Sequence, residues 1–142
     1  MISKGFHENC FACGERSVNG LKLKFELLDD GTLYSKYKIN KNYQGYDNQS
    51  HGGIVSTILV SSMINLFYIK DGLKLSTGRL NIRFRKPIPV EKTFAIKTVV
   101  QPKIRHFYKA KSQIIISDEV YAEARGYFKN EILRRRNYDP TE

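Results

Sequence analysis

The sequence predicts an α+β fold in which a curved antiparallel sheet of about five to six strands wraps around one long central helix. One apolar run, residues 54–67, has no continuous polar face and is typical of a helix that is buried on most sides. Several segments on both sides of this run alternate apolar and polar residues, as half-buried antiparallel strands do. Because such a helix must be covered, we expect the strands to curl around it.

The elements before and within the helix follow from alternation and turn residues. Residues 21–27 alternate strictly and predict a strand, and residues 29–31, Asp-Asp-Gly, predict the turn into a returning strand over residues 32–39. A polar loop, residues 40–50, leads to His51-Gly52-Gly53 at the start of the helix. The helix is expected to end near residues 70–72, with Gly72 as its C-terminal cap.

The remaining residues predict four more strands, over 76–85, 93–103, 107–117 and 120–129. Prolines at 87 and 89 close the first of these, because proline cannot donate a ladder hydrogen bond. No repeat or linker interrupts the chain. We therefore expect a single domain over residues 1–142, with an N-terminal segment over 1–20 and a basic tail over 130–142.

Composition limits the classes of function. The chain has 24 Lys and Arg against 14 Asp and Glu, a net charge of +10, which suits an anionic partner such as a phosphorylated cofactor or nucleic acid. No apolar run reaches the roughly 18 residues of a membrane span, so no membrane partner is expected. With two cysteines and no secretory signal, a cytoplasmic location is expected.

The start of the helix, His51-Gly52-Gly53, is the clearest candidate site. Two glycines leave the first backbone N–H groups of the helix open to an anionic or polarised oxygen, which the helix dipole also favours. The same glycines would equally allow close packing of the helix against the sheet. The sequence favours the site over the packing explanation.

Six short motifs follow one another along residues 10–128: residues 10–14 (CFACG), 19–23 (NGLKL), 43–46 (YQGY), 51–54 (HGGI), 83–90 (RFRKPIPV) and 122–128 (AEARGYF). In this order they resemble the hotdog-fold acyl-CoA thioesterases of the phenylacetate-degradation type, within the group that begins with a Cys-x-x-Cys-Gly segment. The resemblance implies a hotdog fold and a homodimer or homotetramer whose sheets join edge to edge. It also implies acyl thioesters bound at the subunit interface, with coenzyme A along the outside and no other cofactor.

In that family a backbone N–H after the His-Gly pair polarises the thioester carbonyl, and an Asp or Glu on the partner's helix attacks or activates water. Here the carboxylate positions hold Val60 and Ser61, and the next carboxylate is Asp71. The favoured function is a hydrolase acting on acyl-CoA or acyl-carrier thioesters, with slow or narrow activity. The alternatives are a non-catalytic acyl-CoA-binding module and, less favoured, a basic dimer that binds nucleic acid.

Roles follow for the candidate residues. Gly53 is expected to donate to the carbonyl, His51 and Gln44 to position it, and Ser61, Ser62 or Asp47 to orient water. Alternatives stay open. His51 as a structural residue that orients the loop or caps the helix, and Asp47 as an ordinary turn residue, are each favoured over a chemical role. The hydroxyls of Ser61 and Ser62 would equally bond back to a helix carbonyl. The residues expected to bind other parts of the substrate are Gly52, Asn48, Ser62 and Thr77, with Arg83, Arg85 and Lys86 near the phosphates of coenzyme A.

His7, Cys10 and Cys13 recur every third residue and suggest a zinc site. A structural zinc ion takes four ligands, and the chain has no second Cys-x-x-Cys; His51 or His106 could complete the set only through folding. Packing of two small thiols is therefore the favoured interpretation, and no metal is expected.

Overall fold

The computed structural model describes residues 7–130, so the predicted basic tail lies outside the described residues. These residues form one long helix, α1, six strands and a single 3-10 turn. Their bounds are β1 (Glu26–Leu27), β2 (Leu33–Lys38), η1 (Lys41–Tyr43), α1 (Gly52–Asp71), β3 (Leu75–Phe84), β4 (Thr93–Ile104), β5 (Phe107–Ile116) and β6 (Glu119–Asn130). The predicted order of elements is confirmed, and the polar loop additionally contains η1.

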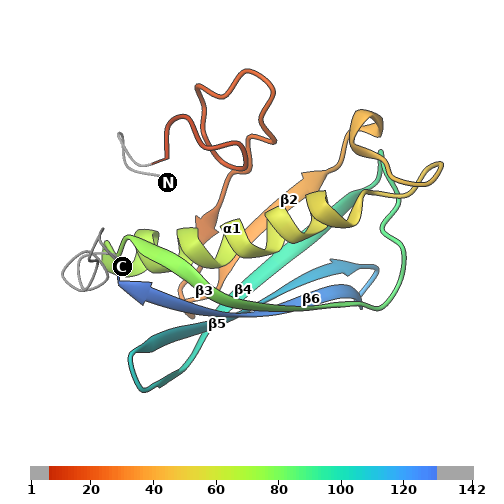
Figure 1. The fold of residues 1–142 in the computed structure, drawn as a ribbon. Coiled ribbons are helices and arrows are strands. Elements are labelled where there is room, and N and C mark those ends of the chain that lie inside the picture. Colours follow the sequence, from red (N-terminus) through yellow and green to blue (C-terminus); the bar gives the residue numbers. More distant parts are fainter. Residues whose placement is uncertain (1–6, 131–142) are drawn as a thin grey trace, which may run out of the picture.

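All six strands join one antiparallel sheet in the order β1-β2-β4-β5-β6-β3, and α1 lies across one face of it (Figure 1). In β4, β5 and β6, alternate side chains face the helix and are buried, among them Ile96, Ile114 and Phe128. The other face of these strands carries mainly charged and polar residues, with a few apolar ones such as Val99. This alternation is the period-2 pattern that predicted the strands.

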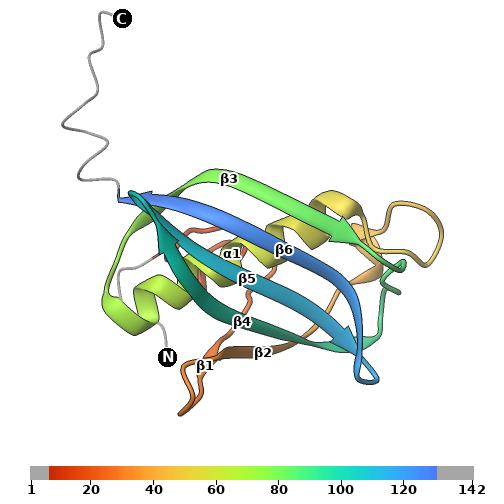
Figure 2. The same cartoon turned by 90° about the horizontal axis from the view of Figure 1, so that it is seen from below.

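The side of α1 away from the sheet is covered by the N-terminal segment, residues 7–25. In Figure 1 this segment lies above α1 while the sheet lies below, and Figure 2 shows the helix behind the strands. Ala12, Cys13, Leu21 and Leu23 of the segment are buried in the core. The helix is apolar on most sides because it is covered twice, by the predicted sheet and by an N-terminal segment that was not predicted to pack on it.

The strand predicted over residues 21–27 is wrong for most of its length. Only Glu26–Leu27 pairs with β2. The N–H groups of Leu21 and Leu23 instead donate to the carbonyls of Phe11 and Ala12, at 2.8 and 2.9 Å. The side chains still alternate between buried and exposed, but the backbone groups that would form a ladder are used by the N-terminal segment.

Helix α1 ends where the sequence predicted. Gly72 adopts the left-handed conformation, with φ 67°, and its N–H returns to the carbonyls of Phe67 and Tyr68. By length and composition α1 could also span a membrane. Its burial between the sheet and the N-terminal segment accounts for the same composition, since Ile58, Leu59 and Met63 are fully buried.

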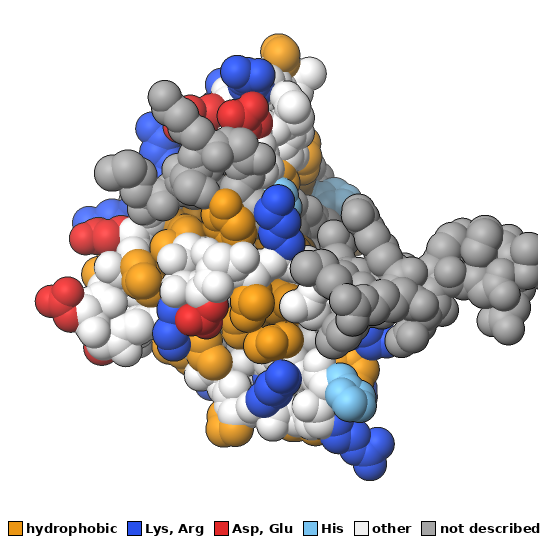
Figure 3. Space-filling model, turned by 90° about the vertical axis from the view of Figure 1, so that its left-hand side faces the viewer, with side chains coloured by type: hydrophobic (Ala, Val, Ile, Leu, Met, Phe, Trp, Pro, Cys, Tyr) orange, Lys and Arg blue, Asp and Glu red, His pale blue; other side chains and the backbone are white. Residues whose placement is uncertain are grey.

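Positive charge is scattered and not gathered into one patch on the face of the molecule shown in Figure 3. On the face shown in Figure 3, hydrophobic side chains gather near the middle, and Lys and Arg are scattered around them with a few Asp and Glu. The described residues visible in this view therefore form no continuous basic surface of the kind that a nucleic-acid backbone requires.

Candidate functional site

The polar loop places the start of α1 against the connection between β3 and β4. His51 donates its N–H to the carbonyl of Tyr43 at 2.9 Å, and Gln44 pairs with Ser50 in an isolated β-bridge. Ser50 then donates its N–H to the carbonyl of Ile88 at 2.8 Å. The helix start is thus held by backbone hydrogen bonds on both sides.

His51 caps the helix. Its backbone is extended (φ −62°, ψ 133°), and its ring Nδ1 accepts the N–H of Gly53 at 2.9 Å. The next two N–H groups, of Ile54 and Val55, donate to the carbonyl of His51. The His51 ring thus serves as the N-terminal cap of α1 in this structure.

This cap corrects the prediction that Gly53 supplies the open donor, because in this structure the His51 ring occupies that N–H. Within residues 7–130, the Gly52 N–H is the one donor of this first turn without a hydrogen-bond partner. Gly52 is exposed, so its N–H can be reached from outside. The open donor is one residue earlier than predicted.

A pocket of about 210 Å³ lies beside this donor. It is lined by Gln49, Ser50, Gly52, Val55 and the segment from Phe84 to Ile88. Phe84 forms one wall: its ring would lie 3.8 Å from a Cβ atom placed on Gly52, and 56% of the residue is exposed. The pocket therefore combines a helix N-terminus with an apolar wall, which suits a carbonyl attached to an apolar group.

Ser50 is a member of this pocket that the sequence did not suggest. Its hydroxyl is buried and has no hydrogen-bond partner among the described residues. A buried hydroxyl without a partner is unfavourable unless a ligand or water completes it. Its position directly before His51 was the only signal in the sequence.

The residues predicted to bind phosphate line this pocket and a groove next to it. Arg85 and Lys86 line the pocket, and Arg83 and Arg85 also line a neighbouring groove of about 580 Å³ on β3 and β6, together with Arg125. The groove and the pocket share Arg85, so one extended ligand could occupy both.

Two of these basic groups are paired with carboxylates. Arg85 contacts Glu123 at 2.9 Å, and this guanidinium holds the pKa of the Glu123 carboxyl below its usual range. Lys86 contacts Glu119 at 2.6 Å, and the hydrogen bond raises the pKa of Lys86. Arg83 makes no ion pair with the described residues, which leaves its full charge available to an anion.

The other predicted residues do not line the pocket of a single chain. Gln44 accepts the N–H of Asn48 through its Oε1 at 3.2 Å and so closes the loop, and Asp47 is exposed on the same loop. Ser62 is buried and donates to the carbonyl of Ile58 at 2.6 Å, which is the non-catalytic alternative considered for it. Thr77 is exposed on β3.

Ser61 and its neighbour Val60 are half-buried on α1, more than two turns from Gly52. Apart from Asp71 at its last position, α1 contains no carboxylate. Val60 and Ser61 of one chain would lie beside the Gly52 donor of a second chain only in a suitable dimer. Such a dimer stays a prediction.

The two cysteines are free thiols, and Cys13 lies in the core. Burial raises the pKa of the Cys13 thiol to about 12. The packing role favoured for this cysteine agrees with its burial.

No protein-family model and no curated protein matches the sequence. Solved structures do match the fold. A thioesterase superfamily protein superposes with a TM-score of 0.75 at 19% identity, over 82% of this chain and 61% of that chain. The chain thus spans less than two thirds of that protein.

Two further structures are similar. The E. coli PaaI protein from the phenylacetic acid degradation operon matches with a TM-score of 0.68 at 15% identity, over 78% of this chain and 84% of that chain. A Bacillus halodurans protein solved with CoA matches with a TM-score of 0.66 at 20% identity, over 78% and 74%. The predicted hotdog fold is confirmed by these similarities together with the sheet order and the single central helix.

Proposed function

We propose that this chain binds acyl thioesters of coenzyme A or of an acyl carrier, with the thioester carbonyl at the N-terminus of α1, and that it hydrolyses them slowly. The observation that carries the proposal is the open Gly52 N–H inside the pocket walled by Phe84. A fixed donor at a helix start stabilises the oxygen that becomes negative when the carbonyl is attacked. The CoA-bound structure of the same fold supports the choice of ligand.

The acyl group and the nucleotide would take the two hollows that meet at Arg85. Val55, Phe84 and Ile88 give the smaller pocket apolar walls suited to an acyl group. The larger groove carries Arg83, Arg85 and Arg125 against one carboxylate, Glu123, which suits phosphates. The carbonyl then lies between them, next to Gly52 and the unpaired Ser50 hydroxyl.

Hydrolysis needs a water molecule that loses a proton as it attacks the carbonyl carbon, after which the thiolate leaves and takes up a proton. The described part of α1 has no carboxylate near Val60 to accept that proton. We propose that hydrolysis is slow for this reason, and that two chains associate so that residues 60 and 61 of one face the Gly52 donor of the other.

The first experiment measures thiol release from a panel of acyl-CoA substrates of different length and aromaticity, together with binding by calorimetry. We expect saturable binding and slow release with at least one member. Binding without release from any member would replace the hydrolase by the non-catalytic module. No thioester binding, with salt-dependent affinity for RNA or DNA, would contradict the proposal in favour of a basic interaction protein.

A gain-of-function variant tests the mechanism. Val60→Asp places a carboxylate at the position where the resemblance implies one, and general-base catalysis contributes typically 10²–10⁴-fold. We expect thiol release to rise by at least tenfold, while the matched control Val60→Asn leaves it unchanged. A Val60→Asp protein that folds and binds ligand but shows no gain would contradict the proposed arrangement.

Phosphate recognition can be tested separately. Arg83→Gln is expected to weaken binding of an acyl-CoA several-fold and to leave binding of the corresponding acyl-pantetheine, which lacks the nucleotide phosphates, unchanged. Equal effects on both ligands would show that Arg83 does not contact those phosphates.

A further inference from the structure

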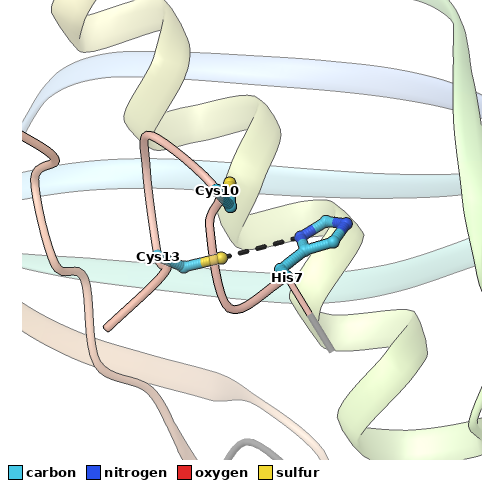
Figure 4. Close-up of side chains that lie close together, drawn as sticks. All are labelled: His7, Cys10 and Cys13. Carbon is cyan, nitrogen blue, oxygen red and sulfur yellow. Dashed lines mark hydrogen bonds between the residues drawn. The ribbon is translucent and has the colours of Figure 1, made fainter. Parts of the chain in front are cut away.

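The N-terminal segment brings three metal-binding side chains together, away from the thioester pocket. The ligand atoms of His7, Cys10 and Cys13 all lie within 4.8 Å of one another. Nδ1 of His7 is 3.6 Å from Sγ of Cys13, and Figure 4 shows these side chains gathered at one bend of the segment. No lining residue of the pocket beside Gly52 belongs to this cluster.

The backbone of residues 7–16 fixes this arrangement. Cys10 donates its N–H to the carbonyl of His7 at 2.9 Å, and Gly14 donates to the carbonyl of Cys10 at 2.8 Å. A Cβ atom on Gly14 would lie 2.4 Å from both the Cys10 nitrogen and the Glu8 carbonyl oxygen, so this tight loop requires glycine there. The three side chains are therefore brought together by the fold of the loop.

The distances fit a tetrahedral zinc site. With Zn–S of about 2.3 Å and Zn–N of about 2.0–2.1 Å, the ligand atoms of a tetrahedron lie about 3.6 Å apart for N to S and about 3.8 Å for S to S. The His7–Cys13 separation already has this value. The widest separation, 4.8 Å at most, has to shorten by about 1 Å, which side-chain rotation of the half-buried Cys10 can supply.

Two polar groups outside the ligand set lie beside the sulfurs. The N–H of Ala12 points at Sγ of Cys10 at 3.4 Å. On the other side, the side chain of Asn65, which is fully buried on α1, interacts with the Cys13 thiol. Hydrogen bonds of this kind from outside the ligand set orient metal-bound sulfurs and stabilise their charge.

We propose that His7, Cys10 and Cys13 bind a zinc ion, with a fourth position left open for water or another donor. Thiolate and imidazole ligands together select zinc over the harder cations. The expectation of no metal assumed a structural zinc ion with four protein ligands, whereas three protein ligands with one open position is also an established zinc geometry. The ion would fasten the N-terminal segment to α1 through Cys13 and Asn65, independently of the proposed thioester activity.

The test uses the full chain, purified with a non-chelating reductant and freed of metal. Zinc is titrated by competition with a chromogenic chelator, and cobalt replaces zinc for absorption spectra. We expect one zinc per chain and a cobalt spectrum with intense thiolate charge-transfer and tetrahedral bands. His7→Gln and Cys10→Ser are expected to weaken zinc binding at least tenfold. His106 was another candidate ligand, but it lies exposed in the turn between β4 and β5 and is not part of the cluster. His106→Gln therefore serves as the matched control and should bind zinc as the unmodified chain does.

A second measurement does not depend on the variants. The chain has only two cysteines, so bound zinc is expected to slow the reaction of both with a thiol reagent, and a chelator to restore it. Absence of zinc binding at micromolar concentrations, equal affinity in the His7→Gln chain, or unprotected thiols at saturating zinc would each overturn the proposal. Thiol release from acyl-CoA is measured on the same samples, so the two proposals fail separately.

Discussion

Replacing His51 by alanine removes the cap on the first turn of α1. The Nδ1 atom accepts the Gly53 N–H at 2.9 Å, and alanine leaves that donor to water. Loss of an N-terminal cap destabilises a protein by about 1 kcal/mol, within a range of about 0.5–2 kcal/mol. Unfolding entropy is about 2.1 cal/mol/K per residue, which for a chain of 142 residues is about 0.3 kcal/mol/K. The expected decrease in Tm is therefore about 3 °C.

The assay is thermal unfolding of the unmodified chain, His51→Ala and His51→Asn. Asparagine is a good capping residue, so His51→Asn should recover most of the lost stability. The same variants also test the proposed ligand site. If the Gly52 N–H is the donor to the thioester carbonyl, the His51→Asn protein should still bind the ligand. An unchanged Tm in His51→Ala, or an equal loss in His51→Asn, would refute the reasoning about the cap.

Other predictions concern the sheet and the rim of the site. The hydroxyls of Thr98 and Ser112 face each other at 2.9 Å and are fully buried, so Thr98→Val leaves the Ser112 hydroxyl unpaired. We expect a loss of about 1–3 kcal/mol in the free energy of unfolding, largely recovered in the double variant Thr98→Val/Ser112→Ala; urea denaturation of the three proteins measures this, and no recovery would contradict it. Arg85 lowers the pKa of Glu123 in the folded state relative to the unfolded state. At a pH above the unfolded pKa of glutamate the pair therefore stabilises the folded protein. This stabilisation is lost as the pH falls through the pKa of Glu123 in the folded protein. The stability difference between the unmodified chain and Glu123→Gln should therefore shrink between pH 7 and pH 3, and a constant difference would show that the ion pair does not contribute.

Local periodicity was sufficient to predict the helix and most strands. Strands with one buried face alternate apolar and polar residues, and a helix buried on most sides is a long apolar run, so both can be recognised in the sequence. It failed at residues 21–25, where the side chains alternate but the backbone N–H groups of Leu21 and Leu23 bond to the N-terminal segment. That pairing joins residues about ten positions apart through an irregular turn, and no local pattern records it.

The donor proposed for the site lies at the helix end that the sequence indicated, but on the neighbouring amide. Whether Gly52 or Gly53 is open depends on the conformation of His51, whose extended backbone lets its own ring cap the helix. Ser50 was missed because its one signal, a position directly before His51, does not reveal that its hydroxyl is buried. The three-residue spacing of His7, Cys10 and Cys13 was visible, but their distances came only from the fold.

The central claim is that the Gly52 N–H donates to the thioester carbonyl, and amide NMR of the isotopically labelled chain tests it most directly. Two coenzyme A analogues that cannot be hydrolysed are compared: a ketone that keeps the carbonyl and a thioether that lacks it. We predict that the saturating ketone moves the Gly52 amide proton resonance downfield by much more than the thioether does, and moves Gly53 less. An unmoved Gly52 resonance with the ketone bound, or equal shifts with both analogues, would contradict the account.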